Sequence, residues 1–299
     1  MASVSFHHGT RVFQSAETPV LVRLAQTAVI GLIGTAADAD VTKFPLNKPV
    51  QILRPQDAEG LGSDGTLMDA LDSIFDQIGC PIIMVRVEEG ETTPETWANL
   101  VGSQVAFTGV HAFKRASSDG LPKPKLLLAP GFTQTSPADG IASVAVTVGG
   151  TGYDQDSTVV EITGAAGSGA EAQAVVTDGA VTSILVTKPG YGYTGAVTVT
   201  ITGKAGAKDA TATAAKGSVI NPVVAELMGV AENLKAIAYV DGPDTTDQAA
   251  VQYRGLINSG RIFVCDPKVL KFDTEQALNV PQPSSAIWAA RQAKMDLEQ

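Results

Sequence analysis

Histidine and cysteine are scarce in this chain of 299 residues, which has three histidines and two cysteines. So few ligands cannot supply an ordinary structural zinc site at a recognisable spacing. Cys80 and Cys265 lie in or beside apolar runs, and we expect both to be buried thiols that form no disulfide. His7 and His8 are neighbours, and adjacent side chains of an extended chain point apart. We therefore predict no metal site and no cofactor.

Basic residues and long apolar runs are also few. Lys and Arg total 21 against 31 Asp and Glu, which gives a formal net charge of -10. This balance argues against nucleic acid as a main partner, because binding to phosphate depends on Lys and Arg. The chain has no run of 18 apolar residues and no signal-peptide core after Met1, so we expect neither a membrane span nor secretion by that route.

The stretch from Ala28 to Glu89 has the pattern of a strand, a helix and a second strand. Apolar residues recur at steps of three and four from Thr66 to Ile78, which predicts an amphipathic helix with Thr66 as its N-cap. The runs Ala28 to Ile33 and Ile82 to Val87 are almost continuously apolar, as is typical of strands covered on both faces. An α/β layer is therefore predicted.

Further elements of the same kind occur on both sides of a region of different composition. On the N-terminal side we predict strands at Val50 to Leu53 and Leu126 to Ala129, and a helix that starts at Thr93-Pro94. After Gly217 the predicted helices and strands alternate again. They are a helix from Asn221-Pro222 to Leu234, a strand Ala236 to Val240, a helix Thr246 to Asn258, a strand Ile262 to Cys265 and a helix Ser284 to Glu298. The fold class is thus α/β with a mixed sheet, formed by residues 23–135 and 218–299.

The intervening residues 136–217 contain no Arg, His, Cys, Met, Phe, Trp or Asn, but hold 14 of the 30 glycines. They also repeat, because Val144 to Tyr153 recurs forty residues later as Ile184 to Tyr193. Period-two alternation between glycine turns predicts short antiparallel strands. We expect an inserted all-β domain of two repeats in an exposed loop of the α/β domain.

Residues 1–22 have too few large apolar side chains to fold alone, and we interpret them as an extended N-terminal arm. Val12-Phe13 and Val20-Leu21-Val22 could each form a short strand if a sheet offered an edge.

Four features suggest small-molecule or ion binding. Gly60-Leu61-Gly62-Ser63-Asp64-Gly65 has the G-x-G-x-x-G spacing of a dinucleotide loop, but it lies seven residues after the strand that ends at Leu53. A dinucleotide site needs its first glycine in the turn that leaves the strand, so we favour a flexible loop before a helix. Asp38 and Asp40 could hold a cation, but a lone pair in a loop is more typical of turns.

Asp241 and Asp266 each follow a predicted strand, where open α/β sheets place catalytic groups. No nucleophile with an adjacent base accompanies them, so we favour turn and cap roles and predict no catalytic residue. Tyr153, Tyr191 and Tyr193 could line a sugar site, but tyrosines at strand ends more often stabilise turns.

A set of short segments in a fixed order resembles the tail sheath protein of contractile-tailed bacteriophages. His8-Gly9 and Arg11-Val12 match the arm of that family. The resemblance covers about residues 6–135 and 218–299, and the repeats lie outside it. The segments are Thr27 to Ala36, Asp38 to Asp40, Phe44 to Asn47, Pro49-Val50, Gly65 to Leu67, Ile74 to Gln77, Val85 to Gly90, Ala236 to Val240, Tyr253-Arg254 and Asp266 to Asp273.

The resemblance implies a structural protein of the virion tail, assembled in the host cytoplasm, and not an enzyme. Its implied partners are neighbouring sheath subunits in a helical polymer, the tail tube protein, and baseplate and tail terminator proteins. Contraction would drive the tube through the host envelope and lead to genome ejection. Family members continue beyond this length, so the resemblance also implies that a C-terminal part of the core domain is missing. The alternative is an α/β nucleotide-binding enzyme that uses Gly60 to Gly65, and glycan binding by the repeats is a third possibility.

Overall fold

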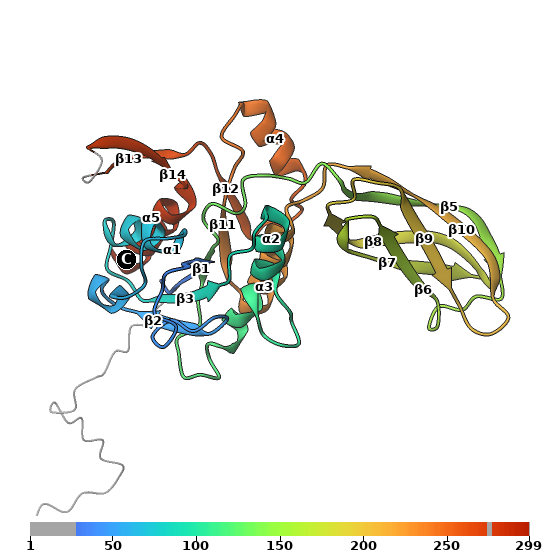
Figure 1. The fold of residues 1–299 in the computed structure, drawn as a ribbon, viewed down its shortest axis with the longest axis horizontal. Helices are drawn as coiled ribbons and strands as arrows, with labels where there is room; N and C mark the ends of the chain where they lie inside the picture. Colours follow the sequence, from blue (N-terminus) through green and yellow to red (C-terminus); the bar gives the residue numbers. More distant parts are fainter. Residues whose placement is uncertain (1–27, 274–276, 299) are drawn as a thin grey trace, which may run out of the picture.

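The computed structural model describes residues 28–273 and 277–298, which form a six-stranded mixed sheet, a six-stranded antiparallel sheet and a two-stranded hairpin (Figure 1). The mixed sheet has helices on both faces, whereas the antiparallel sheet extends to one side of this α/β body (Figure 1). The predictions for residues 1–22, including the pair His7-His8, lie outside the described residues.

The mixed sheet has six strands in the order β12-β11-β4-β1-β3-β2, and β2 alone runs antiparallel to its neighbour. The two strands predicted at Ile82 to Val87 and Ile262 to Cys265 have these bounds in the structure, and the others differ by one or two residues. The strands are β1 (Ile30–Thr35), β2 (Pro49–Ile52), β3 (Ile82–Val87), β4 (Leu126–Leu128), β11 (Ile237–Asp241) and β12 (Ile262–Cys265).

The helices divide between the two faces of the mixed sheet and bury a separate core on each. The face covered by α2, α3, α4 and η2 includes Trp97, Phe113 and Leu227, and the face covered by α1 and α5 includes Leu71, Ile74 and Ala289. The helices are η1 (Pro55–Ala58), α1 (Leu67–Phe75), α2 (Thr93–Val101), η2 (Gly109–Arg115), α3 (Pro222–Leu234), α4 (Asp247–Gly255) and α5 (Ser284–Glu298).

The predicted N-cap positions are confirmed at both α3 and α1, but only the cap of α3 makes side-chain capping bonds. The Asn221 side chain accepts hydrogen bonds from the backbone N–H groups of Val223 and Val224, at 2.9 and 3.3 Å. At α1, the Thr66 side chain makes no capping hydrogen bond, and its Oγ1 instead accepts one from the N–H of Thr35. Thr66 precedes α1 as predicted, but it has helical backbone angles, whereas a residue that caps with its side chain is usually extended.

Helix α5 has the predicted span, but it packs through its alanines. Ala286, Ala289, Ala290 and Ala293 are buried, whereas Trp288 is 50% exposed. Small side chains let the helix lie close to the sheet, so its large apolar residues point away from the core.

Strands at residues 140–217 form an antiparallel sheet in the order β10-β5-β8-β7-β6-β9. Its end strands β9 and β10 also lie close together, so the sheet curls towards a barrel around Ile141, Tyr153 and Tyr193. The strands are β5 (Gly140–Thr151), β6 (Val159–Gly164), β7 (Ser168–Thr177), β8 (Ala180–Tyr191), β9 (Val197–Thr202) and β10 (Lys208–Gly217).

A two-stranded hairpin of β13 (Val269–Asp273) and β14 (Leu278–Gln282) was not predicted. Burial alternates along β13, because Val269 and Lys271 are half-buried whereas Leu270 and Phe272 are exposed. Lys271 Nζ lies 2.8 Å from a carboxylate oxygen of Asp76, just after α1, which ties the hairpin to the mixed-sheet body.

Cys80 and Cys265 are free and buried, as predicted. Burial raises the pKa of the Cys80 thiol to about 11 and that of Cys265 to about 12, so both stay protonated and unreactive at neutral pH.

Candidate functional site

The glycine-rich loop Gly60 to Gly65 lies before α1 and beside the end of β1. The backbone N–H groups of Ser63 and Asp64 donate hydrogen bonds to the Asp38 carboxylate, each at 3.0 Å. These bonds lower the pKa of Asp38 below its usual range, so Asp38 is a carboxylate at neutral pH. A phosphate would have to displace this internal anion, and the loop amides are therefore not free to bind a nucleotide.

The same contact explains one of the glycines. Gly62 has a positive φ of 77°, and a Cβ at this position would collide with the Asp38 carboxylate. Asp40 has a local role too, because its side chain accepts a hydrogen bond from the N–H of Thr42 at 2.8 Å. Asp40 therefore has the local turn contact that we favoured, whereas Asp38 bonds to a loop 25 residues further along the chain. Among the described residues, no group of three or more His, Cys, Asp or Glu could hold a metal ion.

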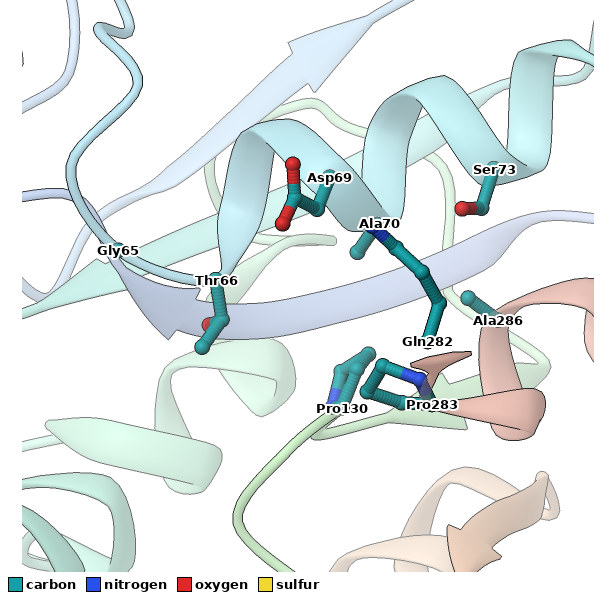
Figure 2. Close-up of a pocket in the computed structure, with 9 residues that line it drawn as sticks. All are labelled: Gly65, Thr66, Asp69, Ala70, Ser73, Pro130, Gln282, Pro283 and Ala286. Carbon is teal, nitrogen blue, oxygen red and sulfur yellow. The ribbon is translucent and has the colours of Figure 1, made fainter. Parts of the chain in front are cut away.

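The cavity next to this loop is small. It lies between the starts of α1 and α5, and Figure 2 shows the side chains of Thr66, Asp69 and Ser73 around it. Its volume is about 80 Å³, whereas pockets for small organic ligands usually span about 300 to 1,000 Å³. This space suits a few water molecules and not a nucleotide.

Asp241 connects three segments of the core. Its carboxylate accepts hydrogen bonds from the N–H and Oγ of Ser285, both at 2.9 Å, and from the N–H of Gly131 at 3.3 Å. Burial raises the pKa of Asp241, although these hydrogen bonds act in the opposite direction. The carboxylate thus holds the start of α5 and the segment after β4 against the end of β11, as expected for a cap residue.

Asp266 also closes a turn. Its Oδ1 accepts a hydrogen bond from the N–H of Asp244 at 2.7 Å, and the Asp244 side chain accepts one from the N–H of Lys268 at 3.1 Å. Neither Asp241 nor Asp266 lines the cavity beside the glycine loop. The structure therefore does not bring the candidate catalytic residues together with the candidate phosphate loop.

The three tyrosines of the antiparallel sheet do not form an exposed row. Tyr153 and Tyr193 are 5% and 1% exposed, and the Tyr193 hydroxyl accepts a hydrogen bond from the N–H of Ala170 at 3.2 Å. Tyr191 contacts Trp97 of α2 edge-on, with ring centroids 5.8 Å apart. These positions favour the interpretation as turn and packing residues over a sugar platform.

A groove between the antiparallel sheet and helices α2 and α3 was not predicted. It has a volume of about 850 Å³, and the charged residues Glu171, Lys188 and Glu226 line it. Lys188 Nζ lies 3.1 Å from Glu171 and 3.4 Å from Glu226, and Glu226 lies 3.3 Å from His111 Nε2. No sequence signal could have revealed it, because these four residues come from four separate segments of the chain.

The ionisable side chains that meet at this groove shift one another's pKa values. The hydrogen bond from His111 lowers the pKa of Glu226, and Lys188 adds to the effect although burial opposes it. Burial acts to lower the pKa of Lys188, but Glu171 and Glu226 outweigh it and the net shift is upward. The antiparallel sheet is therefore attached to α3 by the ion pair between Lys188 and Glu226. It is attached to α2 by the contact between Tyr191 and Trp97.

Large exposed apolar side chains are frequent in the C-terminal elements. Of the 17 in the described residues, eight lie after residue 250, from α4 to α5. They are Val251, Phe263, Leu270, Phe272, Leu278, Trp288, Met295 and Leu297. In the described part of the chain, no helix has the length and hydropathy needed to cross a membrane.

No family model matches the chain. Individual proteins do: it is 35% identical over 158 residues to the tail sheath protein of Escherichia phage P2, which covers 50% of this chain and 40% of the phage protein. Over half of its length, the chain is thus similar to a phage tail sheath protein. It is also 35% identical over 133 residues to the major tail sheath protein of Serratia phage KSP20, which covers 42% of this chain and 34% of that protein.

A longer alignment comes from a putative prophage major tail sheath protein of Pseudomonas aeruginosa. It is 26% identical over 302 residues, and the alignment covers 99% of this chain and 55% of the prophage protein. The chain matches only between 34% and 63% of the lengths of these curated relatives. A solved sheath tail protein from Desulfitobacterium hafniense aligns at 10% identity with a TM-score of 0.27, and we base no conclusion on it.

Proposed function

We propose that this chain is a structural subunit of a contractile phage tail sheath, and not an enzyme. It would polymerise around a tail tube and contract to drive the tube through the host envelope. The similarity to the phage P2 sheath protein carries this proposal. The geometry supports it, because Asp38 occupies the glycine loop and Asp241 is used as a cap. In the described residues, the polar groups that suggested chemistry serve the fold.

The proposed mechanism needs a stiff body and flexible ties between copies. The mixed sheet is covered on both faces and has two packed cores, so it can move as a nearly rigid block. Residues 1–22 would act as an arm that adds a strand to a neighbouring copy, with each hydrogen bond worth about 1 kcal/mol. Head-to-tail contacts that do not close make a helical tube. Contraction would then be a switch between two packings of the blocks.

The chain would divide into an arm of residues 1–22, an α/β core of residues 23–135 and 218–299, and an inserted domain of residues 136–217. The close entry and exit of the insert support this division. The N–H of Val219 donates a hydrogen bond to the carbonyl oxygen of Pro137 at 2.9 Å, so the two connecting segments lie side by side.

We further propose that the insert consists of two repeats related by a pseudo-two-fold axis. Strands of 12, 6 and 10 residues occur twice in succession, as β5-β6-β7 and β8-β9-β10. Val144 and Ile184, which correspond in the two copies, pair with each other. The third strand of each copy pairs with the first strand of the other, Ala174 with Ile184 and Ala214 with Val144. This exchange would make the two repeats fold as one unit.

In the assembled sheath, the repeats would lie on the outside, away from the tube, because an insert in one loop reaches the tube only if the core is displaced. The partners would be neighbouring copies, the tail tube protein, and baseplate and terminator proteins.

Immunogold electron microscopy of phage particles tests these proposals. An antibody raised against residues 136–217 should label tails along their whole length, in extended and in contracted particles. Tails that are labelled neither by this antibody nor by one against the α/β core would contradict the sheath assignment. If an antibody against the α/β core labels tails but the first antibody labels only disrupted particles, the outward placement of the repeats is wrong. Saturable nucleotide binding by the purified protein would instead favour the enzyme alternative.

A further inference from the structure

The antiparallel sheet meets the mixed-sheet body at a narrow junction. Figure 1 shows the sheet to one side of α2 and α3, with one chain segment that leads to it and one that returns. These two segments lie side by side, because the N–H of Val219 donates a hydrogen bond to the carbonyl oxygen of Pro137. Two adjacent links fix the point of attachment, so the tilt of the sheet depends on the contacts beside them.

Open space lies on two sides of this junction. The groove of about 850 Å³ separates β7 and β8 from α3 and from the residues after α4, and we call it the larger groove. A smaller groove of about 480 Å³ separates the start of α2 from the turns at residues 166–168 and 192–194. Tyr191 and Ala98 line both grooves. The contact between Tyr191 and Trp97 of α2 therefore lies between the two spaces.

This aromatic contact has the properties of a pivot. The two rings meet edge-on, with 79° between their planes and 5.8 Å between their centroids. The body holds Trp97 in place, because its ring is buried and its Nε1 donates a hydrogen bond to the carbonyl oxygen of Phe132 at 3.2 Å. Aromatic pairs stay favourable at centroid distances of about 4.5 to 7 Å. Tyr191 can therefore tilt against Trp97 and keep the contact.

An ion pair crosses the larger groove. Lys188 Nζ lies 3.4 Å from a carboxylate oxygen of Glu226 on α3, and the Glu226 carboxylate also contacts His111 in the body. The Lys188 side chain is 50% exposed, so water and salt compete for the pair and it can break. At the smaller groove, Thr92 and Glu95 bond to each other as the capping box of α2. The ion pair thus restrains the sheet on the side of the larger groove.

We propose that the antiparallel sheet rocks on the Tyr191–Trp97 contact, and that the Lys188–Glu226 ion pair holds it in the position seen here. When the pair breaks, the sheet tilts towards the start of α2, which widens the larger groove and closes the smaller one. Closure buries the apolar surface of Pro94 and Ala166. The sheet has its own core, so it moves as one body. This motion belongs to the single chain and does not rest on the proposed function.

Distances between pairs of spin labels test the rocking in the full chain. Because Cys80 and Cys265 are buried, engineered cysteines on the surface react selectively with the label. One pair of labels spans each groove, and double electron–electron resonance measures the distance at low and at high salt. The label positions, all exposed, are Thr187→Cys with Asn258→Cys across the larger groove, and Thr194→Cys with Glu91→Cys across the smaller groove.

Opposite shifts of the two distances would show rotation about a point between the grooves. At low salt, the wild type should give one narrow distribution for each pair. Lys188→Gln, or high salt in the wild type, should lengthen the distance across the larger groove and shorten the other, each by more than the width of the wild-type distribution. Lys208→Gln changes an exposed lysine of β10 and should leave both distances unchanged.

The other outcomes contradict the proposal. If Lys188→Gln and high salt leave both distances unchanged, the ion pair does not hold the sheet. If both distances lengthen together, the sheet detaches from α2 and does not rock on it. Equal shifts in Lys188→Gln and Lys208→Gln would show that the general charge of the sheet, and not this ion pair, sets its tilt.

Discussion

Two carboxylates, those of Asp38 and Asp241, occupy the groups that a ligand or a catalytic step at the candidate site would need. Asp38 binds the amides that a phosphate would need, and Gly62 is a glycine because the Asp38 carboxylate lies against it. Asp241 holds the start of α5 and the segment after β4. At the residue scale, the groups that suggested catalysis stabilise turns and helix starts.

Replacing Asp241 should therefore destabilise the fold. In Asp241→Ala, the N–H groups of Ser285 and Gly131 lose their buried acceptor, and we expect a loss of about 3 kcal/mol in the free energy of unfolding. Urea denaturation followed by circular dichroism measures this change. Glu89→Ala is a suitable control, because Glu89 is exposed. Equal stabilities of the two variants would show that Asp241 is not a structural cap.

At the scale of elements, the antiparallel sheet meets α2 and α3 through few contacts of two kinds. The Tyr191–Trp97 contact is apolar. Lys188 forms ion pairs with Glu171 and Glu226, and His111 donates a hydrogen bond to Glu226. The ionic contact depends on pH and salt, so the attachment of the sheet should depend on them too.

Stability should fall in acid through Glu226. Its pKa is lower in the folded chain than the usual 4.5, so the unfolded chain binds the proton more tightly. The ionised Glu226 carboxylate therefore stabilises the fold fully at a pH above its usual pKa. This stabilisation is lost as the pH falls through about 4.5 towards the lower pKa of the folded chain. We expect Glu226→Gln to flatten the dependence of the urea midpoint on pH between 6 and 3. The control is Glu171→Gln, which changes a more exposed partner of Lys188 and should keep most of the pH dependence of the urea midpoint. If the urea midpoint of Glu226→Gln varies with pH as steeply as that of the wild type, this account is wrong.

At the scale of the whole molecule, two sheets with separate cores are joined by two neighbouring segments (Figure 1). Because Val219 bonds to Pro137, removal of residues 138–218 leaves chain ends that a few glycines can connect. Such an arrangement is typical of a domain inserted into a surface loop.

A variant that lacks residues 138–218, with a short glycine link in their place, should therefore fold. We expect a cooperative thermal transition and a red-shifted emission of Trp97, because Tyr191 no longer covers it. Tyr191→Ala in the full chain provides the comparison, as it should shift the emission in the same direction and keep the antiparallel sheet. Aggregation or loss of the cooperative transition in the deletion variant would show that the two sheets fold as one unit.

The sequence by itself determined the elements whose pattern is local. The apolar runs predicted β3 and β12, the pair Asn221-Pro222 predicted the start of α3, and the glycine-rich alternation predicted antiparallel strands, because periodicity and capping act over a few residues. The arm of residues 1–22 and the two-repeat division remain predictions.

Only the tertiary structure decided what depends on distant residues. Asp38 reaches the glycine loop across 25 residues, and the charged chain of the groove joins residues 111, 171, 188 and 226. The buried alanine face of α5 and the open edge of β12 likewise follow from which neighbours the fold supplies. A sequence specifies such contacts only through the whole fold, since the energy of each contact depends on burial and on a partner far along the chain.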